Sequence, residues 1–142
     1  MKNILVALEF DDKATEILAK AEEFAHTFKA KLWLLHVAAP DPDFVGYEPG
    51  PQSTRDWRAD ELKHEHKSLD QSAQILRDHG IDAESLLIPG VTTEVLLGKS
   101  KELDIDLIIM GHNHHSFLYK AFFGSNAAHV IKKTETPVLI IP

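Results

Sequence analysis

One stretch near the end of the chain holds the residue types best suited to binding chemistry. It reads MGHNHHSFLYKAFFGS over residues 110–125, with Gly111 and Gly124 near its ends. If Gly124 and Ser125 directly precede a helix, the free backbone N–H groups of its first turn, near Ser125 and Asn126, would point outward and could hold a phosphate. Gly111 has no Cβ, which allows either a close backbone approach or a positive φ. The structural alternative is that Gly111 only makes a turn and Ser125 only caps a helix.

Three histidines in the same stretch raise the alternative of a metal site. His112, His114 and His115 fall within four successive positions. In an extended loop His112 and His114 would face one way and His115 the other, whereas a metal needs three or four converging ligands. The chain has no cysteine, and no carboxylate is arranged beside these histidines. We therefore expect no metal site, and these three histidines remain the candidate ligands of the alternative.

Catalytic motifs are not evident in the sequence. Ser125 and His129 lie four residues apart on an expected helix, but there is no G-x-S-x-G elbow and no assignable acid for a triad. A G-x-x-x-x-G-K-S/T loop is also absent, which excludes a lysine-assisted NTPase of that type. The sequence therefore indicates a binding and signalling module that is not an enzyme.

Length and composition predict one globular domain. The chain has 142 residues, of which 44% are hydrophobic and 26% charged, an ordinary balance for a single domain spanning residues 1–142. The formal net charge of -7 argues against a nucleic-acid partner, since duplex binding depends on neutralising phosphates. No apolar run approaches the roughly 20 residues of a membrane span, and the N-terminus runs straight into a strand-like segment without a leader. We expect a cytoplasmic protein with no membrane contact.

Strand-like and helix-like segments alternate along the chain. Short apolar runs typical of buried strands occur at residues 4–8, 32–37, 107–110 and 138–141, and a weaker strand is expected at residues 83–88. Helices are expected at residues 14–28, 56–79, 91–103 and 126–133. Asp11 and Asp12 should cap the first helix and Gly80 should end the second, while the prolines and glycines of residues 40–55 predict an exposed, mobile connection. This alternation predicts an α/β domain with a parallel sheet.

The expected sheet indicates where a ligand would bind. In open parallel sheets, ligands bind at the carboxyl ends of the strands, beside the point where the strand order reverses. The candidate segments therefore follow the first, second and fourth strands, at residues 9–11, 37–39 and 111–125. The last of these is the stretch with the two glycines and the histidines.

Four segments together resemble the universal stress protein family. They are ILVALEF at the start, KLWLLHV in the second strand, DLIIMG before the loop, and GSNAAHVIKKTETPVLIIP at the end. The resemblance covers essentially all 142 residues. It implies a Rossmann-like α/β fold, with five parallel strands in the order 3-2-1-4-5 flanked by four helices, in a protein that is usually a dimer.

The loop matches the motif of the ATP-binding branch of this family with one change. That motif runs glycine, two residues, glycine, nine residues, then glycine followed by serine or threonine. Here Gly111, Gly124 and Ser125 keep the spacing, but His114 stands at the second glycine. The Cβ and imidazole of His114 occupy space where a phosphate would meet bare backbone. A second departure is Glu9, where ATP-binding members usually place aspartate.

The resemblance implies an adenine nucleotide, ATP or AMP, with or without Mg²⁺. Adenine and ribose would meet the end of the first strand and the backbone of Val37, and the phosphates would meet the loop. Any hydrolysis of ATP should be slow and incidental. The implied nucleotide-binding residues are Ala7, Leu8, Glu9, Val37, Met110, Gly111, His112, His114, Gly124, Ser125 and Asn126.

A second function class stays open, because one branch of the family lacks the motif. The protein would then be a ligand-independent dimeric stress protein that acts through contacts with regulatory partners. In either class the fifth strand, apolar and at a sheet edge, invites antiparallel pairing with its copy in a homodimer, unless its own chain covers the edge. The implied interface residues are Val138, Leu139, Ile140 and Ile141. Four loop residues would be a partner surface if exposed and core if buried: Phe117, Leu118, Phe122 and Phe123.

Overall fold

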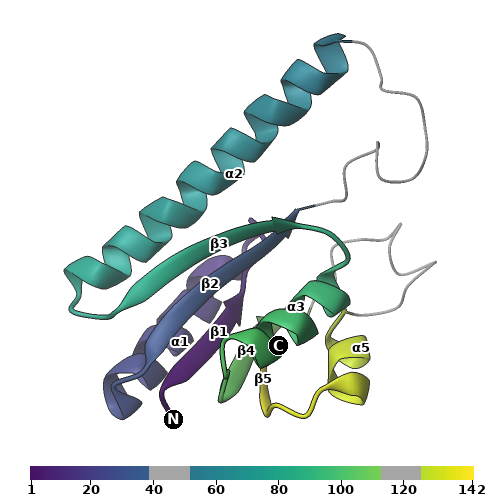
Figure 1. Ribbon diagram of the computed structural model, residues 1–142. Helices are drawn as coiled ribbons and strands as arrows, with labels where there is room; N and C mark the ends of the chain where they lie inside the picture. The colour runs from purple at the N-terminus through teal and green to yellow at the C-terminus, as the bar shows by residue number, and fades with distance from the viewer. Residues whose placement is uncertain (39–51, 113–125) are drawn as a thin grey trace.

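The computed structural model of the protein describes residues 1–38, 52–112 and 126–142, with the side chains of residues 52–56 and 126 left out. Five strands and four helices alternate within these ranges (Figure 1). They are β1 (Asn3–Ala7), α1 (Ala14–Phe28), β2 (Lys31–Ala38), α2 (Gln52–Asp78), β3 (Ala83–Pro89), α3 (Thr92–Glu102), β4 (Leu107–Gly111), α5 (Asn126–Lys133) and β5 (Val138–Ile141).

All five strands form one parallel sheet in the order β3-β2-β1-β4-β5, which confirms the predicted fold class and strand order. β1 lies at the centre, where Leu5 pairs with Trp33 of β2 on one side and with Ile108 of β4 on the other. β3 and β5 are the two edges. The strand order therefore reverses at β1, between β2 and β4.

Alternate residues of β1 pack into two cores on opposite faces of the sheet. Ile4 and Val6 belong to a core with buried residues of α1 and α2. Leu5 belongs to a second core with Leu96 of α3 and Val130 of α5. Because successive strand side chains point to opposite faces, a strand buried on both faces must be apolar throughout, as the run at residues 4–8 is.

The long helix α2 extends further than the sequence predicted. It begins at Gln52, not near Asp56, so the first turn occupies the end of the stretch predicted as an irregular connection. Pro51 stands immediately before the helix, and proline is favoured at a helix start because its missing N–H would have no helical partner there. Residues 40–51, the rest of that predicted connection, lie outside the described residues.

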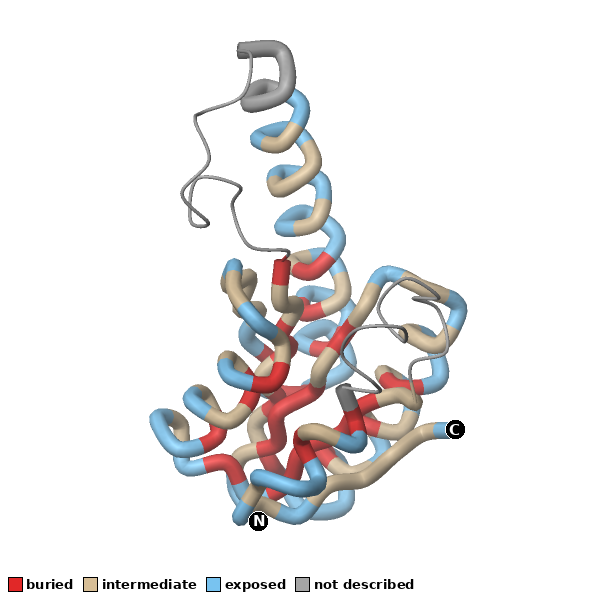
Figure 2. Tube along the Cα trace, turned by 90° about the vertical axis from the view of Figure 1, so that its right-hand side faces the viewer, coloured by how far each residue is buried: buried red, intermediate tan, exposed pale blue. Residues whose placement is uncertain are grey.

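Only the C-terminal half of α2 is packed on the sheet. Leu69, Ala73 and Leu76 are buried, as the predicted inner stripe requires, but Leu62 is only half-buried. The part of the helix before Leu69 extends beyond the strands in Figure 1 and carries no buried residue from 57 to 68, as Figure 2 shows. Gly80 ends the helix with φ 86°, and the Ile81 N–H donates back to the Leu76 carbonyl. This left-handed glycine confirms the predicted stop.

The start of α1 differs from the predicted cap. The N-cap position is Lys13, which makes no side-chain capping hydrogen bond. Asp11 lies before it and forms a turn, in which its Oδ1 accepts the Lys13 N–H at 3.0 Å and its carbonyl accepts the Ala14 N–H at 3.2 Å. Aspartate can cap a helix or mimic a backbone turn with the same side chain, and here the turn displaces the cap by two residues.

Candidate functional site

A cleft opens at the carboxyl ends of β1, β2 and β4, at the reversal of strand order. Such a position is where open α/β sheets bind their ligands. The cleft is lined by Ala7, Leu8, Glu9, Asp11, Lys13, Leu35, Val37, Thr92, Met110, Gly111 and His112.

Seven of the eleven residues predicted for a nucleotide site meet in this cleft. They are Ala7, Leu8, Glu9, Val37, Met110, Gly111 and His112. His114, Gly124 and Ser125 lie outside the described residues, as do His115 and the four apolar residues of the same loop. Asn126 is the first residue of α5, at the boundary of the described part.

The floor of the cleft is built from strand ends that stay paired. The Leu8 N–H donates to the Leu35 carbonyl at 2.8 Å, one residue beyond β1. Leu8 and Met110 are buried, and Ala7 and Val37 are half-buried. Apolar side chains on adjacent strands thus provide a surface on which the flat face of a ring could stack.

His36 holds the segment that follows β1 through a hydrogen bond and a ring contact. Its Nδ1 lies 2.8 Å from the Leu8 carbonyl oxygen, and since a carbonyl only accepts, Nδ1 is the protonated nitrogen. The ring of Phe10 packs against the imidazole with 4.5 Å between centroids. Nε2 lies 3.7 Å from Oε2 of Glu65 on α2. These contacts fix the segment that places Glu9 and Asp11 at the rim of the cleft.

Gly111 packs closely against a side chain of α1 and has no positive φ. A Cβ at this position would lie 3.0 Å from Cδ1 of Ile17. In the part of the chain that the structure describes, only Gly80 and Gly90 among the glycines have positive φ. Gly111 therefore does not take the positive φ that was one of its two predicted uses, and a close approach of its backbone to a ligand stays a prediction. The neighbouring His112 N–H donates to the Ile141 carbonyl at 2.9 Å, so β4 stays paired with β5 up to the cleft.

Four lining residues were missed by the site prediction. Asp11 lay in a candidate segment but was not chosen, and Lys13, Leu35 and Thr92 were not considered. Leu35 shares a strand face with Val37, two residues on, and this spacing was a usable signal. Lys13 and Thr92 enter because the starts of α1 and α3 lie beside the strand ends, which depends on the packing of those helices.

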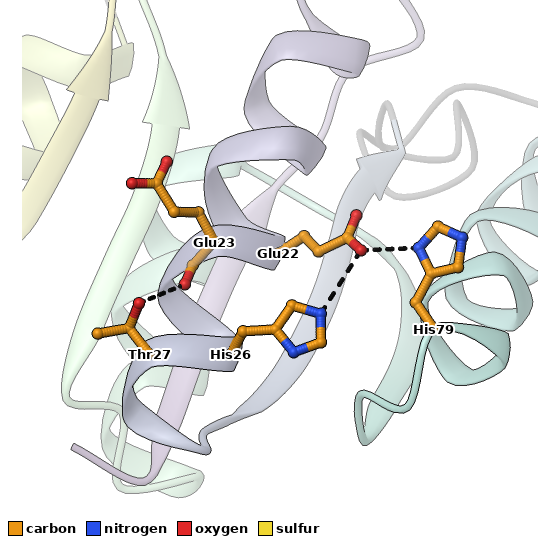
Figure 3. A network of polar contacts seen from close by, with 5 residues as sticks. All are labelled: Glu22, Glu23, His26, Thr27 and His79. Atoms are coloured by element: carbon orange, nitrogen blue, oxygen red, sulfur yellow. Dashed lines mark hydrogen bonds and ion pairs between the residues drawn. The ribbon is translucent and has the colours of Figure 1, made fainter.

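Histidines and carboxylates also meet away from the cleft. Glu22 Oε1 lies 2.7 Å from Nδ1 of His79 and 3.7 Å from Nε2 of His26, which links α1 to the end of α2 (Figure 3). Among the described residues, no group of three or more His, Cys, Asp or Glu side chains is placed to hold a metal. The alternative metal site at His112, His114 and His115 falls mostly outside those residues, so it stays a prediction.

None of the helices within the described ranges is long and apolar enough to cross a membrane.

The parallel sheet defines a Rossmann-like α/β protein, and its cleft lies at the reversal of strand order, where such sheets commonly bind ligands. The model of the universal stress protein family matches residues 1–142. The chain therefore belongs to the universal stress protein family, as its resemblance predicted.

Relatives and solved structures agree with this assignment. Universal stress protein C of Escherichia coli K12 is 29% identical over 141 residues, which cover 99% of this chain and 94% of the relative. Universal stress protein UspA from Lactobacillus plantarum has the same fold, with a TM-score of 0.80, 20% identity, and coverage of 99% of this chain and 97% of its own. A universal stress protein from Archaeoglobus fulgidus in complex with dAMP matches with a TM-score of 0.71 and 19% identity, over 100% and 98% of the two chains.

Proposed function

We propose that this protein is a stress-response regulatory module that binds an adenine nucleotide, ATP or AMP, in the cleft at the ends of β1, β2 and β4. The observation that carries the proposal is the meeting of seven predicted site residues in one cleft at the reversal of strand order. The apolar floor suits a purine ring, and the polar rim suits ribose and phosphate. The dAMP complex of the Archaeoglobus relative supports an adenine ligand.

Each part of the nucleotide has a proposed partner. The adenine stacks on the floor and meets the backbone of Val37, while the Glu9 carboxylate accepts from ribose hydroxyls. The phosphates extend toward Gly111 and His112, and the proposed phosphate loop continues through His114 to Gly124, Ser125 and Asn126. Mg²⁺, where present, enters with the phosphates instead of binding a dedicated protein cage.

The proposed role is binding and signalling, with at most slow, incidental ATP hydrolysis. The chain lacks the lysine-containing phosphate loop of dedicated NTPases. Occupancy of the cleft would change the surface that the protein presents to regulatory partners in the cytoplasm.

The proposed assembly is a homodimer through β5. Among the residues that the structure describes, this strand pairs with β4 alone, and all four of its residues, Val138–Ile141, are half-buried. An apolar edge strand is a template for pairing with a second chain. A two-fold axis beside β5 would join the two sheets antiparallel.

Thermal denaturation with ATP, AMP, GTP and adenosine, on protein freed of carried-over ligand, tests the nucleotide proposal. A ligand that binds only the folded state adds about 2.7 kcal/mol of stability at 100 times its dissociation constant. We expect stabilisation by adenine ligands that persists in EDTA and is weakened for ATP by Gly124→Val. The absence of any shift in wild type up to millimolar nucleotide would overturn the proposal and leave the ligand-independent dimer.

A further inference from the structure

Lys13 is a lysine at the rim of the cleft that the family resemblance did not indicate. It lines the cleft together with Glu9, Asp11 and His112. The turn made by Asp11, whose Oδ1 accepts the Lys13 N–H at 3.0 Å, fixes the backbone of Lys13 at the start of α1. The position of this lysine is therefore set by a hydrogen bond within the cleft's own rim.

The packing of α1 puts Lys13 on the phosphate side of the cleft. The Ile17 N–H donates to the Lys13 carbonyl at 3.0 Å, so the two residues are one helical turn apart. The Ile17 side chain in turn packs against Gly111, where a Cβ would lie 3.0 Å from Cδ1. Lys13 therefore lines the same cleft as Gly111 and His112, the residues at which β4 leads into the proposed phosphate loop.

The charges at the rim call for a cation if a phosphate is to bind. Glu9 and Asp11 carry two carboxylates at the cleft, inside a chain whose formal net charge is -7. Like charges brought together in a cleft repel, so the phosphates of a nucleotide need a local countercharge. Lysine supplies a compact positive charge that suits phosphate oxygens.

We propose that the Lys13 ammonium pairs with the phosphates of the bound nucleotide and makes the cleft prefer ATP over adenosine. This inference rests on the proposed function and names the residue that distinguishes phosphate-bearing ligands from uncharged ones. On binding, Nζ leaves its present partner, Oε2 of Glu16 at 3.3 Å, and turns to the phosphate.

The ion pair between Lys13 and Glu16 is weak enough to be broken when a phosphate binds. The Lys13 and Glu16 side chains are 33% and 60% exposed, three residues apart on one helix. Exposed pairs of this kind contribute only about 0.2–1 kcal/mol. The ammonium can therefore exchange one carboxylate for a doubly or triply charged phosphate chain with little loss.

The test compares ATP with adenosine by isothermal titration of the full-length chain and its variants. We expect Lys13→Ala to weaken ATP binding by about tenfold or more, as loss of a charge-assisted bond does, and to leave adenosine affinity unchanged. Lys13→Arg should retain most of the ATP affinity, and the ATP affinity of wild type should fall more steeply with salt than that of Lys13→Ala.

Lys20→Ala is the matched control. Lys20 pairs with Glu23 at the same spacing on the same helix, at 2.6 Å, and does not line the cleft. It should leave the affinity for ATP unchanged. Glu16→Gln removes the competing carboxylate and should tighten ATP binding by about twofold.

The outcomes separate this inference from the proposed function. If folded Lys13→Ala binds ATP as tightly as wild type does, the proposed role of Lys13 is overturned and the nucleotide site is retained. An equal loss of ATP and adenosine affinity in Lys13→Ala also overturns it, because a phosphate contact cannot affect a ligand without phosphate. Failure of wild type to bind either ligand overturns the proposed function itself.

Discussion

The imidazole of His36, at the end of β2, donates its Nδ1 proton to the carbonyl oxygen of Leu8 over 2.8 Å. Its other nitrogen faces Glu65 of α2, whose Oε2 is a buried atom with no hydrogen-bond partner among the described residues. One side chain thus connects the segment after β1 to the helix that packs over β2 and β3. Removal of His36 leaves the Leu8 carbonyl without its donor and takes the nearest imidazole nitrogen, 3.7 Å away, from the buried Glu65 oxygen.

We expect His36→Leu to lower the free energy of unfolding by about 1–3 kcal/mol, the usual result of leaving a buried polar group without its partner. Urea denaturation measures this change. The double variant His36→Leu/Glu65→Leu should recover part of the loss, because it no longer buries an uncompensated carboxylate. A double variant less stable than the sum of the two single changes would contradict the pairing.

Asp106 should give the protein an acid-sensitive contribution to stability. Its Oδ2 accepts the Lys2 and Asn3 N–H groups at 2.7 and 2.9 Å, and these bonds, Asn3 first, lower the pKa of the carboxyl. A lowered folded pKa means that the contribution is present above the unfolded value of about 3.9 and is lost as the pH falls through the folded pKa.

The difference in unfolding free energy between wild type and Asp106→Asn, followed by urea denaturation at several pH values, measures this contribution. We expect wild type to be the more stable near neutral pH and the difference to shrink as the pH falls below about 4. Asp60→Asn, at an exposed position of α2, is the control and should show no such trend. A difference independent of pH would refute the role of the carboxylate.

Ile140→Pro should disrupt the proposed dimer without unfolding the subunit. The carbonyls of Pro137 and Ile141 accept from the N–H groups of Ile108 in β4 and of His112 just after it. Odd-numbered residues here therefore bond toward β4, and the Ile140 N–H points to the outer edge of the sheet. Proline is tolerated at an edge position whose N–H is not used by its own sheet. Light scattering at micromolar concentration should therefore find a folded monomer.

Leu139→Pro is the contrasting variant for this experiment. Leu139 packs against the core that contains α1 and α2, and a proline there would disturb the pairing with β4, so it should unfold the protein. A dimer that persists in folded Ile140→Pro would place the subunit contact elsewhere.

Gly111→Val should destabilise the protein more than Gly111→Ala. A single added carbon meets only the flexible end of Ile17, at 3.0 Å, so alanine should change the free energy of unfolding by less than about 1 kcal/mol, whereas the larger valine should cost about 1–3 kcal/mol. Thermal and urea denaturation measure both. Ile17→Val removes the contacting Cδ1 and should therefore reduce the stability cost of Gly111→Ala. If that cost stays the same in the Ile17→Val background, a contact other than Ile17 is its cause.

The sequence by itself determined the order of strands and helices along the chain, because burial on two faces requires a local run of apolar residues. A strand covered on both sides must be apolar at every position, as residues 4–8 and 107–110 are. A glycine after an amphipathic stretch favours the left-handed end of a helix, as Gly80 does with φ 86°. Glu9, Val37, Gly111 and His112 were predictable for a related reason, since they lie at the carboxyl ends of strands that must meet at one edge of the sheet. The family resemblance, and not this argument, indicated Ala7, Leu8 and Met110.

Only the tertiary structure decided which side chains from other elements lie beside these strand-end residues and which distant residues contact one another. Lys13 reaches the cleft because α1 packs Ile17 against Gly111, and His36 meets Glu65 because α2 crosses over the end of β2. Asp106 holds the N–H groups of Lys2 and Asn3 from 104 and 103 residues away. No local pattern encodes such contacts, because they depend on how separate elements are packed, and packing is set by all of their buried surfaces together.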